Sequence, residues 1–255
     1  MAFIWSKNGG NDDFPNGFGL PLDNSFLMMM VIYEGLNDSI NQVQDGLILN
    51  YNDELRLKPV HRLLVGHQAS GKHVILSNQR DWITDGYCSG HCTLDYNIDT
   101  TNENPSSVQI MGFEVHTRSL GTVAHIDVQY EGTKYDTPLL APTSFDSSNS
   151  IKRVSQSLTE SYSLHPGDDL ILRCHHSTLG KVLPIFGGVA TQDELCFAVL
   201  THHCPDRQYC PMNTLTSCMS RPTDENIAKA LQFSLNYYET TYYEEVSNIL
   251  ENNPK

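Results

Sequence analysis

The chain has 255 residues, 39% hydrophobic and 18% charged, which is enough to form one large core or two modest ones. Its net charge of −14 disfavours nucleic acid as a partner, because phosphate binding requires clustered Lys and Arg, and no polybasic membrane-binding patch is present. No apolar run approaches the ~20 residues of a membrane-spanning helix, and the first residues lack the pattern of a signal peptide.

Most of the chain is predicted to form short strands separated by Gly, Asn, Asp and Pro clusters. In YEGTKY at 130–135, Gly132 is expected to supply the positive φ of a hairpin turn. The pattern predicts an all-β fold, an antiparallel β-sandwich of jelly-roll type. The expected strands lie at 26–33, 43–51, 60–66, 73–77, 108–117, 122–130, 151–163, 169–176 and 195–203.

The C-terminal segment has a different pattern. Thr223 is a good N-cap, and apolar residues then recur at helical spacing, which predicts an amphipathic helix over 224–250. We expect this helix to pack on the sandwich. An exposed interaction helix is the alternative, because Tyr residues at 237, 238, 242 and 243 suit a partner surface.

The segment from Phe113 to Arg118 alternates in a way that places Glu114, His116 and Arg118 on one face of a strand. A His-x-His pair at this point would direct two imidazoles at one metal ion. This chain has His-x-Arg instead. His116 is therefore a remnant of a metal site, part of another site, or an ordinary strand histidine.

Seven cysteines allow a disulfide framework or a zinc site. Their spacings match neither a zinc ribbon nor a finger, which favours disulfides and leaves one thiol over. Two adjacent histidine pairs are also present, 175–176 and 202–203. Neighbouring strand residues point to opposite faces, so neither pair chelates by itself. One member of each pair could converge with His116 or His125, but ordinary core or surface histidines are favoured.

Three segments occur in an order that resembles a known family: FEVHTRSLG, LHPGDDLILRC and FGGVATQDELCFAVL. Together they resemble the C-terminal half of the copper type II, ascorbate-dependent monooxygenases, such as dopamine β-monooxygenase and peptidylglycine α-hydroxylating monooxygenase. GYCSGHCT at 86–93 and GLNDSI at 35–40 are similar to the dopamine and tyramine branch. The resemblance implies two stacked sandwiches with one copper each. The first copper has three His ligands and takes electrons from ascorbate, and the second binds O2 through a His-x-His pair and a Met.

The resemblance implies three regions. Residues 1–45 would be the last strands of the N-terminal copper domain, 46–222 the C-terminal copper domain, and 223–255 a helical tail. His116 matches the first His of the O2-side pair, Arg118 replaces the second, and Leu195 replaces the Met. Ile32 stands where the third His of the ascorbate-side copper belongs. A guanidinium and an aliphatic side chain do not ligate copper, so we expect copper not to bind here.

Further expectations follow from the resemblance alone. Glu114 would occupy the place of a carboxylate-binding Arg, and Phe197 and Val199 would replace polar substrate contacts. Cys174 would pair with Cys196, tying two neighbouring strands. Cys88 would pair with Cys210, and Cys92 with Cys218 or Cys204. The family is secretory, so we expect the secretory pathway or the extracellular space.

Three hypotheses remain open. The first is a truncated, catalytically incompetent member of the family, a pseudoenzyme that does not process the small amines or peptides of its relatives. The second is a partial product of a longer copper-dependent hydroxylase. The third is a secreted, non-enzymatic binding module whose protein partner is unknown.

Overall fold

The computed structural model describes residues 14–21, 48, 50–51, 54, 56–67, 73–90, 107–146, 152–165, 167–188, 193–204 and 217–219. The regular structure of these segments is β, and no helix among them is long and apolar enough to cross a membrane. The helix predicted over 224–250 lies outside the described residues, as does the strand predicted at 26–33.

The first of two five-stranded sheets has the order β10-β6-β13-β3-β14. Its neighbours pair antiparallel, except that β14 runs parallel to β3. The strands are β3 (His61–His67), β6 (Val108–Thr117), β10 (Lys152–Leu164), β13 (Cys196–His203) and β14 (Ser217–Met219). The long central strands β6 and β13 hold the family-motif residues side by side.

The second sheet has the order β5-β11-β7-β8, and β9 also pairs with β7. All of its pairings are antiparallel. The strands are β5 (Trp82–Cys88), β7 (Gly121–Tyr130), β8 (Thr133–Lys134), β9 (Leu140–Ser144) and β11 (Asp168–His176). Two small ribbons complete the described fold, β1 (Phe18–Gly19) beside β2 (Lys58–Pro59) and β12 (Ile185–Phe186) beside β4 (Val74–Ile75).

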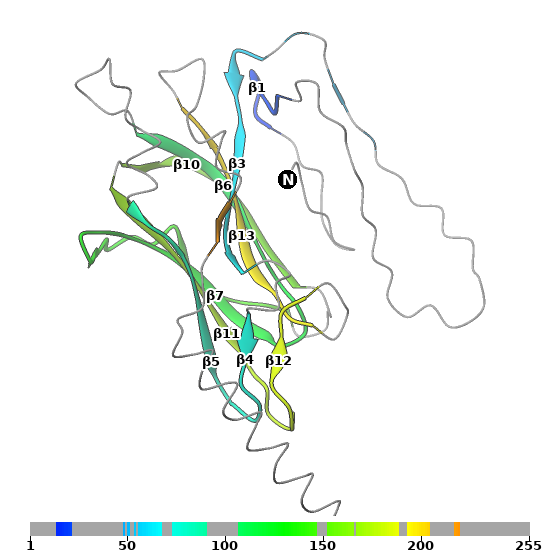
Figure 1. Ribbon diagram of the computed structural model, residues 1–255. Helices are drawn as coiled ribbons and strands as arrows, with labels where there is room; N and C mark the ends of the chain where they lie inside the picture. Colours follow the sequence, from blue (N-terminus) through cyan, green and yellow to red (C-terminus); the bar gives the residue numbers. More distant parts are fainter. Residues whose placement is uncertain are drawn as a thin grey trace, which may run out of the picture.

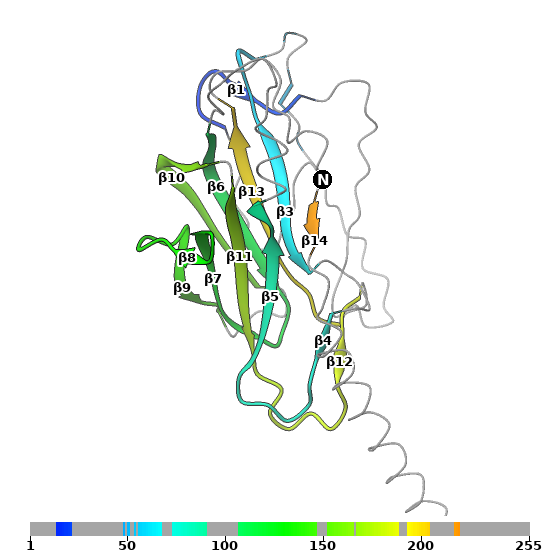
Figure 2. The ribbon, with the colours of Figure 1, turned by 60° about the vertical axis from the view of Figure 1, so that its left-hand side comes forward.

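The two large sheets stack face to face, as Figures 1 and 2 show from two directions. Apolar side chains from both sheets form one buried cluster between them, including Leu63, Phe113, Ile126, Leu172 and Leu200. This arrangement confirms the predicted antiparallel β-sandwich. Burying such side chains contributes about 1.5–3 kcal/mol each relative to exposure, which is the main force that holds the sheets together.

A register irregularity in β6 determines which side chains face outward. The pairing of β6 with β13 shifts between Gly112 and Ile110, so the strand gains one residue there. Beyond the shift Phe113 and Val115 lie in the core, as the alternation predicted. Glu114 and His116 therefore lie on the other face of the first sheet.

The predicted hairpin at 130–135 is present between β7 and β8, with Gly132 at a φ of +78°. Two further glycines, Gly66 and Gly86, lie where the two sheets come close together. A Cβ on Gly86 of β5 would lie 2.4 Å from the Cα of Gly66 of β3, a distance at which the backbones would have to separate. These two glycines thus allow β3 and β5, from different sheets, to approach closely.

The segment 14–21 contacts the end of the sandwich. Phe18 packs edge-on against His203 with ring centroids 5.0 Å apart, and β1 hydrogen-bonds to β2 just before β3. Of the strand predicted at 43–51, only residues 48, 50 and 51 are described, and they are not in a strand. The domain limits expected at residues 45 and 222 stay predictions.

Candidate functional site

Glu114, His116 and Arg153 form a charged group on the outer face of the first sheet. β10 lies antiparallel to β6 and places Arg153 opposite His116. Nε2 of His116 lies 3.2 Å from one carboxylate oxygen of Glu114, and a guanidinium nitrogen of Arg153 lies 2.9 Å from the other. Burial opposes ionisation of Glu114, but the hydrogen bond from His116 and the charge of Arg153 outweigh it and lower the pKa of Glu114.

The other side of His116 is apolar. Its ring stacks on Phe197 of β13 with centroids 5.3 Å apart and an interplanar angle of 20°. Phe197 belongs to a small cluster with Leu64 and Val199, and Leu195 packs against it. The His116 side chain is only 3% exposed. The imidazole is therefore held between an ion pair and an aromatic ring.

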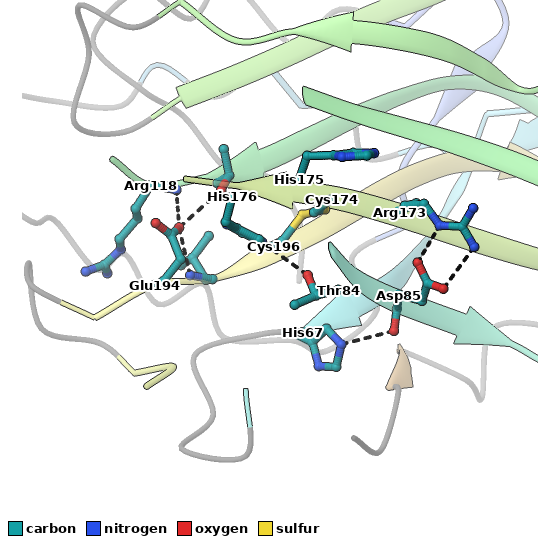
Figure 3. The surroundings of a disulfide bond; sticks show 12 residues. His67, Thr84, Asp85, Arg118, Arg173, Cys174, His175, His176, Glu194 and Cys196 are labelled. Carbon is teal, nitrogen blue, oxygen red and sulfur yellow. Dashed lines mark hydrogen bonds and ion pairs between the residues drawn. A yellow bond between two sulfur atoms is a disulfide. The ribbon is translucent and has the colours of Figure 1, made fainter. Parts of the chain in front are cut away.

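Glu194 holds the turn that follows β6 against the start of β13. Its carboxylate is buried, 1% exposed, and accepts four hydrogen bonds. The donors are the Thr117 hydroxyl at 3.1 Å and the main-chain N–H groups of Arg118 at 2.5 Å, Leu120 at 2.9 Å and Leu195 at 3.0 Å. Figure 3 shows this carboxylate directed at Arg118. Burial raises the pKa of Glu194, and these hydrogen bonds oppose the rise.

Lys152 fastens the same turn from the other side. Its ammonium group donates to the carbonyl oxygens of Ser119 at 2.9 Å and Gly121 at 2.7 Å. Burial lowers the pKa of Lys152, while the nearby charge of Glu194 raises it. Glu194 and Lys152 together therefore fix residues 118–121. They also fix the position of the Arg118 main chain beside that of Leu195.

The Arg118 side chain is buried, and its guanidinium points toward the start of β13, where it donates to the Asp193 carbonyl oxygen at 3.5 Å. Leu195 lies two residues beyond that carbonyl and packs against the Phe197 cluster. The fold therefore brings the positions of His116, Arg118 and Leu195 to one end of β6 and β13. Ile32 lies outside the described residues.

This set of side chains does not suit a copper ion. Copper in both oxidation states accepts imidazole and thioether ligands, but only His116 offers such a donor. Arg118 brings a permanent positive charge without a lone pair, and Leu195 has no sulfur. No group of three or more His, Cys, Asp or Glu side chains in the described part of the chain is arranged to hold a metal ion.

A disulfide joins Cys174 of β11 to Cys196 of β13, with Cα atoms 6.5 Å apart. The resemblance implied this pair as a tie between neighbouring strands. The strands belong to different sheets, so the bond crosses the sandwich instead (Figure 3). Cys88 and Cys204 are also disulfide-bonded. Cys92, Cys210 and the side chain of Cys218 lie outside the description, so the pairs Cys88–Cys210 and Cys92–Cys218 stay predictions.

The histidine pairs divide between the two faces of their strands, as neighbouring strand residues must. His175 lies outward near His125, with ring centroids 5.8 Å apart, and its Nδ1 lies 2.9 Å from Asp81. His202 lies inward, 5.8 Å from the ring of His61. Neither pair converges on His116, which stacks on Phe197 instead. His176 lies in a separate group with His67 and His73.

Several of these roles were not predicted. Glu194 belongs to the DELC motif, but three of its four hydrogen-bond partners are 74 to 77 residues away in the sequence. These partners approach Glu194 only when the chain folds. Arg153 and Lys152 carry no motif. The family substitutions expected at Glu114, Phe197 and Val199 stay predictions. In the structure Glu114 pairs with Arg153, and Phe197 and Val199 belong to one apolar cluster.

Comparison with known proteins identifies the family of this chain. The sequence model of one protein family, the copper type II ascorbate-dependent monooxygenase C-terminal domain, matches residues 60–231, more than half of the chain. The chain therefore belongs to the copper type II ascorbate-dependent monooxygenase family, with this match to its C-terminal domain.

Among individual relatives, DBH-like monooxygenase protein 1 of Gallus gallus is 28% identical over 244 residues, which cover 91% of this chain and 36% of the relative. The Homo sapiens protein of the same name is 27% identical with the same coverage. Human dopamine beta-hydroxylase is 25% identical over 213 residues, covering 81% of this chain and 31% of that protein. The chain thus spans about a third of the length of these relatives.

Proposed function

We propose that this chain is a catalytically inactive member of the copper monooxygenase family whose O2-side position does not bind copper. The observation that carries the proposal is the replacement of two of three ligands around His116. Arg118 and Leu195 occupy the same end of β6 and β13 as His116, so both changes affect one site. A monooxygenase of this type needs a copper that binds O2 beside its substrate, and this site offers one donor.

The polar environment of His116 supports the same conclusion. Its Nε2 is engaged by the ion-paired carboxylate of Glu114, and its ring face is covered by Phe197. A histidine that ligates copper needs a free nitrogen lone pair, and a second imidazole or a thioether has to stand beside it as a further ligand. The side chains that replaced the ligands preserve packing, because Leu fills nearly the volume of Met at low cost in a core.

Location and partners follow as parts of the proposal. The Cys174–Cys196 disulfide supports residence in the secretory pathway or outside the cell, where disulfides persist. Small amines or peptides, the substrates of the family, would not be hydroxylated. The retained sandwich would then act as a binding module for a protein partner.

Restoring the lost ligands tests the proposal. The double variant Arg118→His, Leu195→Met should bind one more copper per chain than wild type, measured by equilibrium dialysis of folded protein. The triple variant that adds His116→Ala should lose that copper again. Equal copper content in the wild type and the double variant, with His116→Ala lowering both, would show that the natural residues already form a copper site.

A further inference from the structure

Large apolar side chains are exposed along one short segment at the end of the sandwich. The segment, residues 179–186, connects β11 to β12 and lies beside β4, at the lower end of Figures 1 and 2. Apolar side chains scattered singly on a surface are normal, whereas several in one segment indicate an interaction surface. The four side chains that we call the apolar tip, each between 41% and 60% exposed, are Leu179, Val182, Leu183 and Phe186.

The main chain that carries the apolar tip is held at both ends. Before it, the buried Thr178 hydroxyl donates to the Leu76 carbonyl oxygen at 2.7 Å and accepts from the Gln79 N–H at 2.8 Å. After it, β12 pairs with β4, and the Gly187 N–H donates to the His73 carbonyl oxygen at 2.6 Å. The apolar side chains are therefore exposed on a main chain that the fold fixes in place.

The segments on both sides of the β4–β12 ribbon carry positive charge. Residues 73–80 and 177–188 contain no Asp or Glu, although the whole chain has a net charge of −14. Asp81, the next residue in the sequence, lies 2.9 Å from Nδ1 of His175 on β11. A partner of the apolar tip should therefore combine an apolar face with acidic residues. The two cations of these segments, both exposed, are Arg80 and Lys181.

The C-terminal segment 224–250 has this complementary composition. It lies outside the described residues, and its sequence predicts an amphipathic helix. It contains five acidic residues and one lysine, a net charge of −4 that is opposite in sign to that of the tip. Helices in proteins gain most of their stability by packing an apolar stripe on an apolar surface. The stripe of this segment consists of Ile227, Leu231, Leu235, Tyr238, Tyr242 and Val246.

The chain approaches the same end of the sandwich just before the C-terminal segment begins. β14 runs parallel to β3 and pairs Met219 with Gly66, so both strands lead toward this end. The next residue of β3, His67, stacks its ring on that of His73 with centroids 4.7 Å apart, and His73 directly precedes β4. Asp224 lies five residues beyond Met219, a distance that an extended chain spans in at most about 18 Å. The segment therefore begins beside the end that carries the apolar tip.

We propose that residues 224–250 form a helix whose apolar stripe packs on the apolar tip of the same chain. Its acidic side chains lie near Arg80 and Lys181, which fixes the helix on this end of the sandwich. A second exposed pair, Ile83 and Tyr87 of β5, is less suited, because Asp85 stands between them on the same face of the strand and forms a salt bridge with Arg173. The helix thus covers the apolar surface that the described residues leave exposed.

Photo-cross-linking in the full chain tests this contact. The photoreactive residue p-benzoylphenylalanine replaces Phe186, whose side chain is exposed, so the fold should be kept. On irradiation we expect a monomeric product in which residue 186 is joined to a peptide from 224–250, identified by mass spectrometry. The same substitution at Tyr87, which is 44% exposed against 43% for Phe186, is the matched control and should give no such product. Cross-links from residue 186 that reach only a second copy, or no residue of 224–250, would overturn the proposal.

Hydrogen exchange measures the docking of the helix in variants of the full chain. Leu183→Ser, Phe186→Ser should speed amide exchange in 224–250 at least about tenfold, because the apolar cover of the helix is lost. Lys181→Glu should speed it by roughly two- to fivefold, since an exposed charge contributes less. Ile83→Ser, Tyr87→Ser is the control for the double variant and should leave this exchange unchanged.

Amide protection in β6 shows in each variant whether the sandwich is still folded. A folded Leu183→Ser, Phe186→Ser variant that exchanges in 224–250 as slowly as wild type would contradict the proposal. Faster exchange in the control pair than in the double variant would also contradict it, because the helix would then lie on β5. None of these results depends on copper, so the proposed function is tested separately.

Discussion

The Glu194 carboxylate accepts a hydrogen bond from the main-chain N–H of Arg118, 76 residues earlier in the chain. Through this contact the residue before Leu195 fixes the backbone of Arg118, the position that the proposed function assigns to a lost copper ligand. The family motif around Glu194 is therefore a structural element that does not depend on metal. The hydrogen bonds to Glu194 hold the end of β6 to the start of β13.

Removing this carboxylate should destabilise the sandwich strongly. Glu194→Ala leaves three main-chain N–H groups, of which that of Arg118 is buried, and the buried Thr117 hydroxyl without this acceptor, so we expect a loss of roughly 3 kcal/mol in the free energy of unfolding. Urea denaturation measures it. Glu160→Gln, on the exposed part of β10, is the control and should change stability by less than about 0.5 kcal/mol. Equal stability of both variants would mean that the four hydrogen bonds do not secure the turn.

The disulfide across the sandwich should contribute to stability through the unfolded chain. The double variant Cys174→Ala, Cys196→Ala opens a loop with a sequence separation of 22 residues, and we expect a loss of about 3 kcal/mol. Denaturant unfolding under non-reducing conditions gives the value. A double variant as stable as wild type would show that packing between the sheets suffices without the bond.

The crossing of β3 and β5 should tolerate no side chain at Gly86. A methyl group there would meet the Gly66 backbone, so Gly86→Ala should cost about 3 kcal/mol. Gly132→Ala is the matched comparison, because Gly132 has open space but a positive φ, and should cost only about 1 kcal/mol. Thermal unfolding of the two variants compares their losses of stability. A smaller loss for Gly86→Ala would place the two strands further apart than described.

Acid should destabilise the fold through buried histidines. Burial, with the nearby His61 and His203 rings adding to it, lowers the pKa of His202 to about 3. The unfolded chain takes up this proton near pH 6.5 and the folded chain only near pH 3, so stability falls as the pH drops between these values. The slope is about 1.4 kcal/mol per pH unit for each such histidine. His202→Gln should reduce the slope of unfolding free energy between pH 6 and 4 by that amount, and an unchanged slope would contradict the assignment.

The sequence allowed the sandwich to be predicted where alternation was clear and turns were well marked. The segments that became β6, β7, β11 and β13 fall within a residue or two of their predicted limits. β5 was missed because WITDGYC contains Asp and Gly, residues typical of turns. In the fold Asp85 pairs with Arg173, and Gly86 permits the approach of β3. β9 was missed because of its proline, which is tolerated there at the edge of the sheet.

The site was predictable only in part. Alternation placed Glu114 and His116 on one face, and the resemblance located Arg118 and Leu195. The partners that define their environment, Arg153 and Glu194, come from distant parts of the chain and leave no local signal. The same holds for His73 and His176, which are distant in the sequence and whose rings meet only in the fold.

The copper content attributable to His116 tests the central claim most directly. Wild-type protein and His116→Ala are loaded with copper under identical conditions, dialysed and analysed for metal. We predict equal copper per chain in both, since His116 has no partner ligands at positions 118 and 195. Wild-type protein that retains about one copper more than His116→Ala would contradict the account.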